Sequence, residues 1–121
     1  MRNFEDLHIW EISRSLVKDL YLLSNRLPDI EKFNIISQIR RSAVSMNINI
    51  SEGCSKDSEK DMLRFISYSL GSAFEIEALL ILCYDLDYIK DDELKRLREK
   101  INIYKKKNIS FSRAIAKRIN N

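Results

Sequence analysis

Apolar residues recur at alternating steps of three and four along four separate stretches of this 121-residue chain. This spacing gathers them on one face of an α-helix, because a helix completes a turn about every 3.6 residues. The stretches cover about residues 7–27, 33–52, 56–87 and 91–119, and their short connections make neighbouring helices antiparallel. The sequence therefore predicts an all-α protein, one antiparallel up-down-up-down four-helix bundle over residues 1–121.

The chain contains only two glycines and one proline, a scarcity that favours long helices over turn-rich β architectures. Pro28 ends the first predicted helix, and Gly53 stands where a left-handed residue would close the second. Gly71 falls inside the third predicted helix, where glycine costs about 1 kcal/mol relative to alanine. We therefore expect Gly71 to permit a close approach by another helix.

The third predicted helix carries two apolar stripes rather than one. Beside its core stripe runs a second stripe, formed by Leu63, Leu70, Phe74 and Ile81. A helix in a lone four-helix bundle needs to bury only one side. The second stripe therefore predicts a homo-oligomer, in which another subunit covers this side.

The side chains that most often carry catalysis or bind metals are scarce. His8 is the single histidine, and Cys54 and Cys83 lack metal-type or redox-motif spacing. No glycine-rich phosphate loop is present, and His8 is the only imidazole base available for a Ser-His-Asp triad. We expect no catalytic site, no metal and no cofactor, and hence no enzyme.

The sequence also carries expectations about location. Its first residues show no basic-then-apolar signal segment, and no uninterrupted apolar run approaches the roughly 20 residues that cross a bilayer. Two cysteines without a disulfide framework are typical of reduced thiols. We expect a cytoplasmic protein with no membrane association.

The formal net charge of +3 is spread unevenly. Residues 1–88 hold ten Lys/Arg against fourteen Asp/Glu, a net charge of −4. Residues 89–121 hold eleven Lys/Arg against four Asp/Glu, a net charge of +7. From Lys100 onward the chain has seven basic residues and no acidic one. This asymmetry indicates a polyanionic partner such as RNA or DNA.

Two groups of basic residues form the candidate nucleic-acid-binding set, which comprises Arg40, Arg41, Lys105, Lys106, Lys107, Arg113, Lys117 and Arg118. Two alternatives stay open. The three consecutive lysines could be a solvated helix face, and the adjacent arginines could pair with buried carboxylates such as Glu75 and Glu77. We also expect Glu52 and Glu75 to act structurally, each meeting an arginine or a backbone donor.

Five segments, taken in order, resemble a known family. The first reads Phe-Glu-Asp-Leu-His-Ile-Trp at residues 4–10, and the second reads Gln-Ile-Arg-Arg-Ser-Ala-Val-Ser at residues 38–45. The others are Asn-Ile-Ser-Glu-Gly at 49–53, Gly71 and Ser72 with Glu75 and Glu77, and Leu-Asp-Tyr-Ile at 86–89. Together they resemble the small bacterial four-helix-bundle proteins encoded within intervening sequences of large-subunit ribosomal RNA genes, also described as ribosomal-protein-like. The chain departs from the family at Ser51 and Ser69, where alanine is usual.

The resemblance implies a closed homo-oligomer, typically a pentamer. It also implies kinship in fold with the pentameric accessory proteins of diversity-generating retroelements, which bind nucleic acid through basic surfaces. The structural signature of the family corresponds here to Asn49, Glu52, Gly53, Gly71, Ser72 and Glu75. We expect a non-enzymatic oligomeric bundle that binds RNA or DNA through its basic surface without strong sequence specificity. The alternative is a structural or protein-interaction scaffold with no nucleic-acid role.

Overall fold

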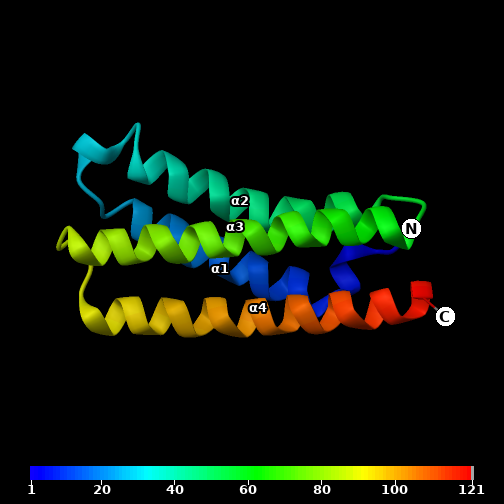
Figure 1. The fold of residues 1–121 in the computed structure, drawn as a ribbon. Helices are drawn as coiled ribbons and strands as arrows, with labels where there is room; N and C mark the ends of the chain where they lie inside the picture. The colour runs from blue at the N-terminus through cyan, green and yellow to red at the C-terminus, as the bar shows by residue number, and fades with distance from the viewer. Residues whose placement is uncertain (121) are drawn as a thin grey trace.

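Four long α-helices run alternately in opposite directions in the computed structural model, which describes residues 1–120 (Figure 1). They are α1 (His8–Ser24), α2 (Ile35–Cys54), α3 (Glu59–Asp85) and α4 (Asp91–Asn120). Two short 3-10 helices, η1 (Phe4–Asp6) and η2 (Asp29–Glu31), precede α1 and α2, and the described residues form no strand. The predicted all-α, up-down-up-down four-helix bundle is confirmed.

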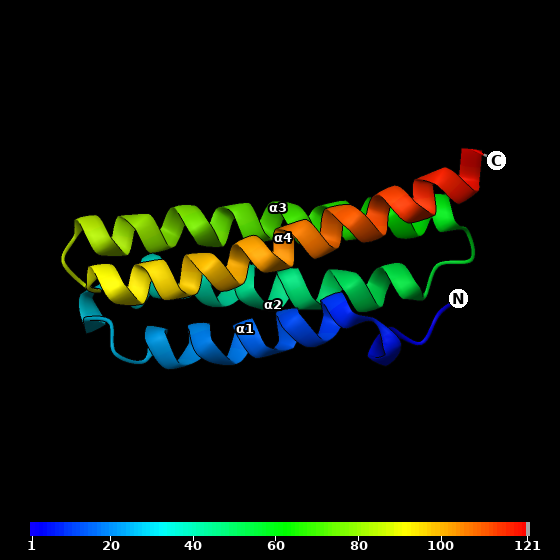
Figure 2. The same cartoon turned by 90° about the horizontal axis from the view of Figure 1, so that it is seen from below.

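The helices pack in chain order around a common core. α2 packs against α1 and α3, and α4 packs against α3 and, less extensively, α1. Within residues 1–120, no Cα atom of α2 lies within 8 Å of one in α4, so these helices occupy diagonal corners of the bundle. Seen from below, α4 runs at an angle to the other helices, and its C-terminal half lies over α3 (Figure 2).

The predicted apolar stripes form the core. Its largest fully buried side chains are Tyr104, Leu16, Leu20, Leu23, Ile39, Met46, Ile50, Ile66, Ile76, Leu80, Leu97 and Ile101. The second stripe of α3 is less buried: Leu63 and Ile81 are half-buried and pack against the core, Leu70 is half-buried, and Phe74 is exposed. One chain therefore leaves apolar surface on α3 uncovered.

α3 is long and apolar enough to cross a membrane, judged by length and composition alone. Its centre nevertheless carries Glu75 and Glu77, and the Glu77 carboxylate pairs with Lys105 and Arg98 of α4. Its inner stripe, with Ile66, Ala73 and Ile76, is fully buried against the other helices. α3 packs against α2 and α4, and a helix that packs in the core of a bundle meets the same criterion of length and composition.

Within one chain, neither glycine has the role expected from the sequence. Gly53 is helical and lies inside α2, and no glycine among the described residues has a positive φ. A Cβ on Gly53 would lie 3.0 Å from the Met62 carbonyl oxygen and 3.2 Å from the Phe65 Cβ of α3. A Cβ on Gly71 would meet nothing within 4 Å. The close crossing expected at Gly71 is therefore wrong within one chain, and Gly53 supplies it.

The left-handed residue lies instead at the end of α3. Asp87 has φ 61°, the one positive φ among the described non-glycine residues. The Asp87 amide donates to the Tyr84 carbonyl (3.0 Å), and the Tyr88 amide donates to the Cys83 carbonyl (2.8 Å). These two bonds form a Schellman motif, which satisfies carbonyls at the helix end and turns the chain into α4.

Candidate nucleic-acid interface

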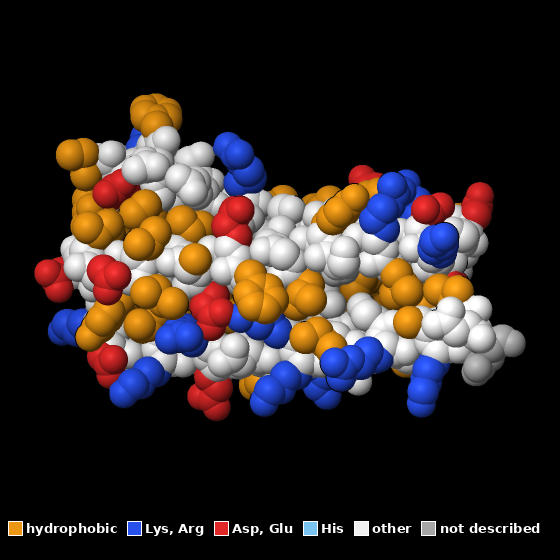
Figure 3. Space-filling view, viewed as in Figure 1, with side chains coloured by type: hydrophobic (Ala, Val, Ile, Leu, Met, Phe, Trp, Pro, Cys, Tyr) orange, Lys and Arg blue, Asp and Glu red, His pale blue; other side chains and the backbone are white. Residues whose placement is uncertain are grey.

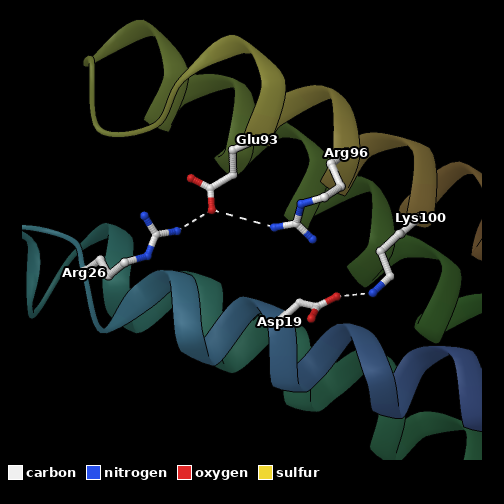
Figure 4. A network of polar contacts seen from close by, with 5 residues as sticks. All are labelled: Asp19, Arg26, Glu93, Arg96 and Lys100. Carbon is white, nitrogen blue, oxygen red and sulfur yellow. Dashed lines mark hydrogen bonds and ion pairs between the residues drawn. The ribbon is translucent and has the colours of Figure 1, made fainter.

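Three of the seven basic residues from Lys100 onward are held in ion pairs. Lys100 pairs with Asp19 of α1, and nearby Glu93 of α4 pairs with Arg26, which follows α1, and with Arg96 of α4 (Figure 4). Arg118 pairs with Glu59 at the start of α3, at 2.5 Å. Lys105 pairs with Glu77 in the middle of α3. These ion pairs hold α4 against α1 and α3. The three basic side chains are therefore less available to a binding partner.

Lys105 is the most deeply buried of these cations, with a relative exposure of 9%. Its ammonium nitrogen lies 3.9 Å from the centroid of the Phe74 ring, and Arg98 donates a second hydrogen bond to Glu77 at 3.2 Å. Burial works to raise the pKa of the Glu77 carboxyl, but the hydrogen bonds from Lys105 and Arg98 outweigh it and hold that pKa below its usual value. The structure thus gives Lys105 a structural role.

The other four basic residues, Lys106, Lys107, Arg113 and Lys117, are exposed, and none of them has an ion pair within residues 1–120. We call these four the α4 basic surface. Blue side chains line the edge of the molecule over α4 in the space-filling view (Figure 3). No acidic residue follows Glu99, so no carboxylate on this part of α4 offsets the four cations.

The two arginines of α2 differ from each other. Arg40 donates to the Ser24 hydroxyl (2.9 Å) and to the Asn25 side-chain oxygen (2.8 Å), and its guanidinium lies over the Tyr21 ring. Arg40 therefore ties α2 to the end of α1. Arg41 is exposed, but it lies on the helix diagonally opposite α4. The structure does not bring Arg40 and Arg41 together with the α4 basic surface.

The partners predicted for the carboxylates of Glu52, Glu75 and Glu77 differ from those in the structure. Neither arginine of α2 pairs with Glu75 or Glu77. Glu75 accepts from the Ser42 hydroxyl rather than from an arginine or a backbone donor. Glu52 is exposed and has no side-chain hydrogen bond or ion pair among the described residues, so the structural role expected of its carboxylate is absent in one chain.

The remaining signature residues form a polar seam between α2 and α3. Asn49 donates to the Ser45 carbonyl (2.8 Å) and to the Ser45 hydroxyl (3.0 Å). Ser72 of α3 donates to the same hydroxyl at 3.0 Å. Together with Gly53, these contacts let the two helix backbones pack closely. This explains why small and polar residues recur here without implying a ligand.

The sequence reading missed a fully buried polar network. The Ser69 hydroxyl donates to the Met46 carbonyl (2.5 Å), which leaves its oxygen to accept from the Tyr104 hydroxyl. Asn108 donates to Tyr104 (3.3 Å) and to the Ile66 carbonyl (3.1 Å), while its side-chain oxygen has no hydrogen-bond partner among the described residues. The available signal was the presence of polar residues at core positions of the heptad stripes.

The groups that could carry chemistry do not converge. His8 is exposed at the start of α1, and the thiols of Cys54 and Cys83 are free and buried at separate places. Burial raises the pKa of the Cys83 thiol to about 11, which keeps it protonated near neutral pH. Within residues 1–120, no group of three or more His, Cys, Asp or Glu side chains is placed to hold a metal ion.

The fold and this surface define a small four-helix bundle with a basic outer helix and no convergent catalytic groups in the described part. Residues 5–110 match the family described as 23S rRNA-intervening sequence protein. The chain belongs to this family, as its resemblance indicated.

A solved structure has the same fold. It is the crystal structure of a protein of unknown function from the S23 ribosomal protein family of Bacteroides thetaiotaomicron VPI-5482. The two chains are 25% identical, with a TM-score of 0.80, over 86% of this chain and 97% of the other. A comparison with curated proteins finds no match.

Proposed function

We propose that this protein is a non-enzymatic, cytoplasmic homo-oligomer that binds RNA or DNA through the α4 basic surface, without strong sequence specificity. The observation that carries the proposal is the set of four exposed cations that have no ion pair within residues 1–120, on a helix without an acidic side chain after Glu99. Cations that have no intramolecular partner remain available for phosphates. Membership in a family named for ribosomal RNA intervening sequences is consistent with a nucleic-acid partner.

The outer side of α3 supports the oligomer. Tyr68, Phe74 and Leu82 are each about half exposed, at 50%, 54% and 48%. Gly71 lies among them and has open space where a side chain would stand. A mid-helix glycine costs about 1 kcal/mol, and among the described residues no close packing at Gly71 offsets this cost. A second subunit packed on this side of α3 would offset the cost of the glycine. The family resemblance favours an oligomer of five subunits.

An oligomer strengthens the proposed binding. Four phosphate contacts in one chain give weak affinity, but several linked surfaces bind with a high effective concentration. The α4 basic surface consists of flexible side chains on a solvent-facing helix, which suits contacts to phosphates rather than to base edges. Affinity should therefore depend steeply on salt and little on sequence.

A fluorescence-anisotropy titration with labelled RNA and DNA oligomers at low and high salt tests the proposal. The test variant replaces Lys106, Lys107, Arg113 and Lys117 with glutamine. The control variant replaces Arg41, Lys18, Lys60 and Lys90 with glutamine, which removes the same charges from exposed positions that lack an ion pair in the described chain. We expect the test variant to bind roughly tenfold or more weakly with a flatter salt dependence, and the control to bind much like wild type.

A protein-interaction scaffold is the rival function, and the charge distribution gives it one specific support. Residues 1–88 carry −4 and residues 89–121 carry +7, so the basic helix of one subunit could meet an acidic face of the next. Light scattering separates the two functions. If the test variant loses oligomer mass and wild type binds no oligonucleotide at low salt, the α4 basic surface serves assembly and our proposal is wrong.

A further inference from the structure

We infer that this protein binds double-stranded rather than single-stranded nucleic acid, and that it contacts the phosphate backbone. This inference rests on the proposed function and specifies the class of nucleic acid that is bound. It follows from where the aromatic side chains lie relative to the α4 basic surface. Proteins that bind single strands combine cations with aromatic side chains on which the bases stack.

The two aromatic residues of α4 both point inward. Tyr104 is fully buried and belongs to the Ser69–Asn108 network. Phe111 is half-buried against the core, and the Arg2 guanidinium lies over its ring. The exposed sides of α4, which carry Lys106, Arg113 and Lys117 together and Lys107 about 100° away, therefore present no aromatic ring to a base.

The exposed aromatic side chains lie on other elements. They are Tyr21 on α1, Phe33 in the connection to α2, and Tyr68, Phe74 and Tyr84 on α3. Three of the rings already hold a cation of the same chain: Arg40 lies over Tyr21, Lys32 over Phe33 and Lys105 over Phe74. No stacking platform is built into the α4 basic surface within residues 1–120.

The cations are instead set along a rigid rod. α4 is one continuous helix anchored in the core by Leu97, Ile101 and Ile115. Lys106, Arg113 and Lys117 are separated by steps of seven and four residues, which correspond to about 10 and 6 Å along a helix. Their total span of about 16 Å exceeds the width of either groove of B-DNA, so the row reaches phosphates on both sides of a groove.

A regular duplex presents its phosphates in a fixed array, and cations on a rigid helix meet them by ordering only their own side chains. A flexible single strand would have to be ordered along the row. Base stacking, worth about 1–3 kcal/mol per base, would not be available to offset that cost. The α4 basic surface therefore favours a duplex over a single strand of equal length.

The experiment compares three probes of 24 nucleotides in the anisotropy titration: a single strand without self-complementarity, the DNA duplex containing it, and the corresponding RNA duplex. We expect both duplexes to bind wild type at least tenfold more tightly than the single strand at intermediate salt. The Asn102→Trp variant places a ring on the exposed side of α4, one turn before Lys106. This variant should gain affinity for the single strand, and its affinity for the duplexes should stay within about twofold.

The two kinds of failure are distinguishable. Equal or tighter binding of the single strand by wild type overturns the duplex inference and leaves the proposed function standing. Binding of none of the three probes at low salt overturns the proposed function and the duplex inference together.

Discussion

Lys105 and Glu77 form the most enclosed ion pair that joins α4 to α3, with side-chain exposures of 11% and 15%. The ammonium nitrogen of Lys105 also lies over the face of the Phe74 ring, so its charge meets both a carboxylate and an aromatic ring. The first lysine in a run of three is thus part of the interior. The two lysines that follow it, Lys106 and Lys107, are exposed.

Lys105→Gln should lower the free energy of unfolding by about 1–3 kcal/mol, because it leaves the Glu77 carboxylate with fewer donors in a mostly buried place. Lys106→Gln is the matched control, since it removes the same charge from an exposed side chain without an ion pair, and should change stability by less than about 0.5 kcal/mol. Urea unfolding monitored by circular dichroism measures both. Equal effects of the two changes would contradict the structural role of Lys105.

The lowered pKa of the Glu77 carboxyl predicts a pH dependence. A carboxyl whose pKa is lower in the folded than in the unfolded chain contributes stability above its usual value of 4.5. This contribution is lost as the pH falls through the folded-state pKa. The destabilisation caused by Glu77→Gln should therefore be largest near pH 7 and shrink below about pH 4.5. Urea titrations of both proteins at a series of pH values check this, and a constant difference across the series would refute it.

Tyr104→Phe removes the central hydroxyl of the buried network. Ser69 and Asn108 then each lose a hydrogen-bond partner where water is excluded, which should cost about 1–3 kcal/mol. Tyr21→Phe is a suitable control, because the Tyr21 hydroxyl makes no hydrogen bond among the described residues and the side chain is exposed. If both variants melt at the temperature of wild type, the network does not contribute to stability.

The fold was predictable because heptad spacing reports directly which side of each helix is buried. The candidate site was only partly predictable. Three consecutive lysines point in directions about 100° apart, and the docking of α4 on α3 decides which one turns inward. Lys105 lies on the side of α4 that meets Glu77 and Phe74 of α3, whereas Lys106 and Lys107 are exposed. The two residues of an ion pair such as Lys100–Asp19 are distant in sequence, so no local sequence pattern predicts the pair.

Asp87 should be replaceable by glycine with a gain in stability. Its left-handed backbone costs an L-residue about 1 kcal/mol or more, whereas glycine adopts it freely. We expect Asp87→Gly to raise the free energy of unfolding by up to about 1 kcal/mol, and Asp87→Val to lower it by more than that. Chemical denaturation of the two variants checks the order. Equal stability of the valine and glycine variants would show that the turn does not require a positive φ.

The two glycines give the last prediction, because the same substitution should act in opposite directions. In Gly53→Ala the new Cβ meets the Met62 carbonyl and the Phe65 Cβ at 3.0 and 3.2 Å, so α2 and α3 must separate, at a cost of about 1–3 kcal/mol. In Gly71→Ala the new Cβ meets open space in a helical position, which should stabilise the isolated subunit by up to about 1 kcal/mol. Urea unfolding of both variants measures the two effects, and a shift in the same direction for both would contradict the prediction.

The larger change Gly71→Leu extends this comparison to assembly. In an isolated subunit the leucine has room, so folding should persist, as judged by circular dichroism. In the proposed oligomer the same side chain would obstruct the neighbouring subunit, and light scattering should show a loss of mass with the helix content unchanged. Wild-type mass retained by Gly71→Leu would place the subunit contact elsewhere than the exposed side of α3 around Gly71. If wild type has the mass of a single chain, the protein is a monomer and the proposed oligomer is wrong.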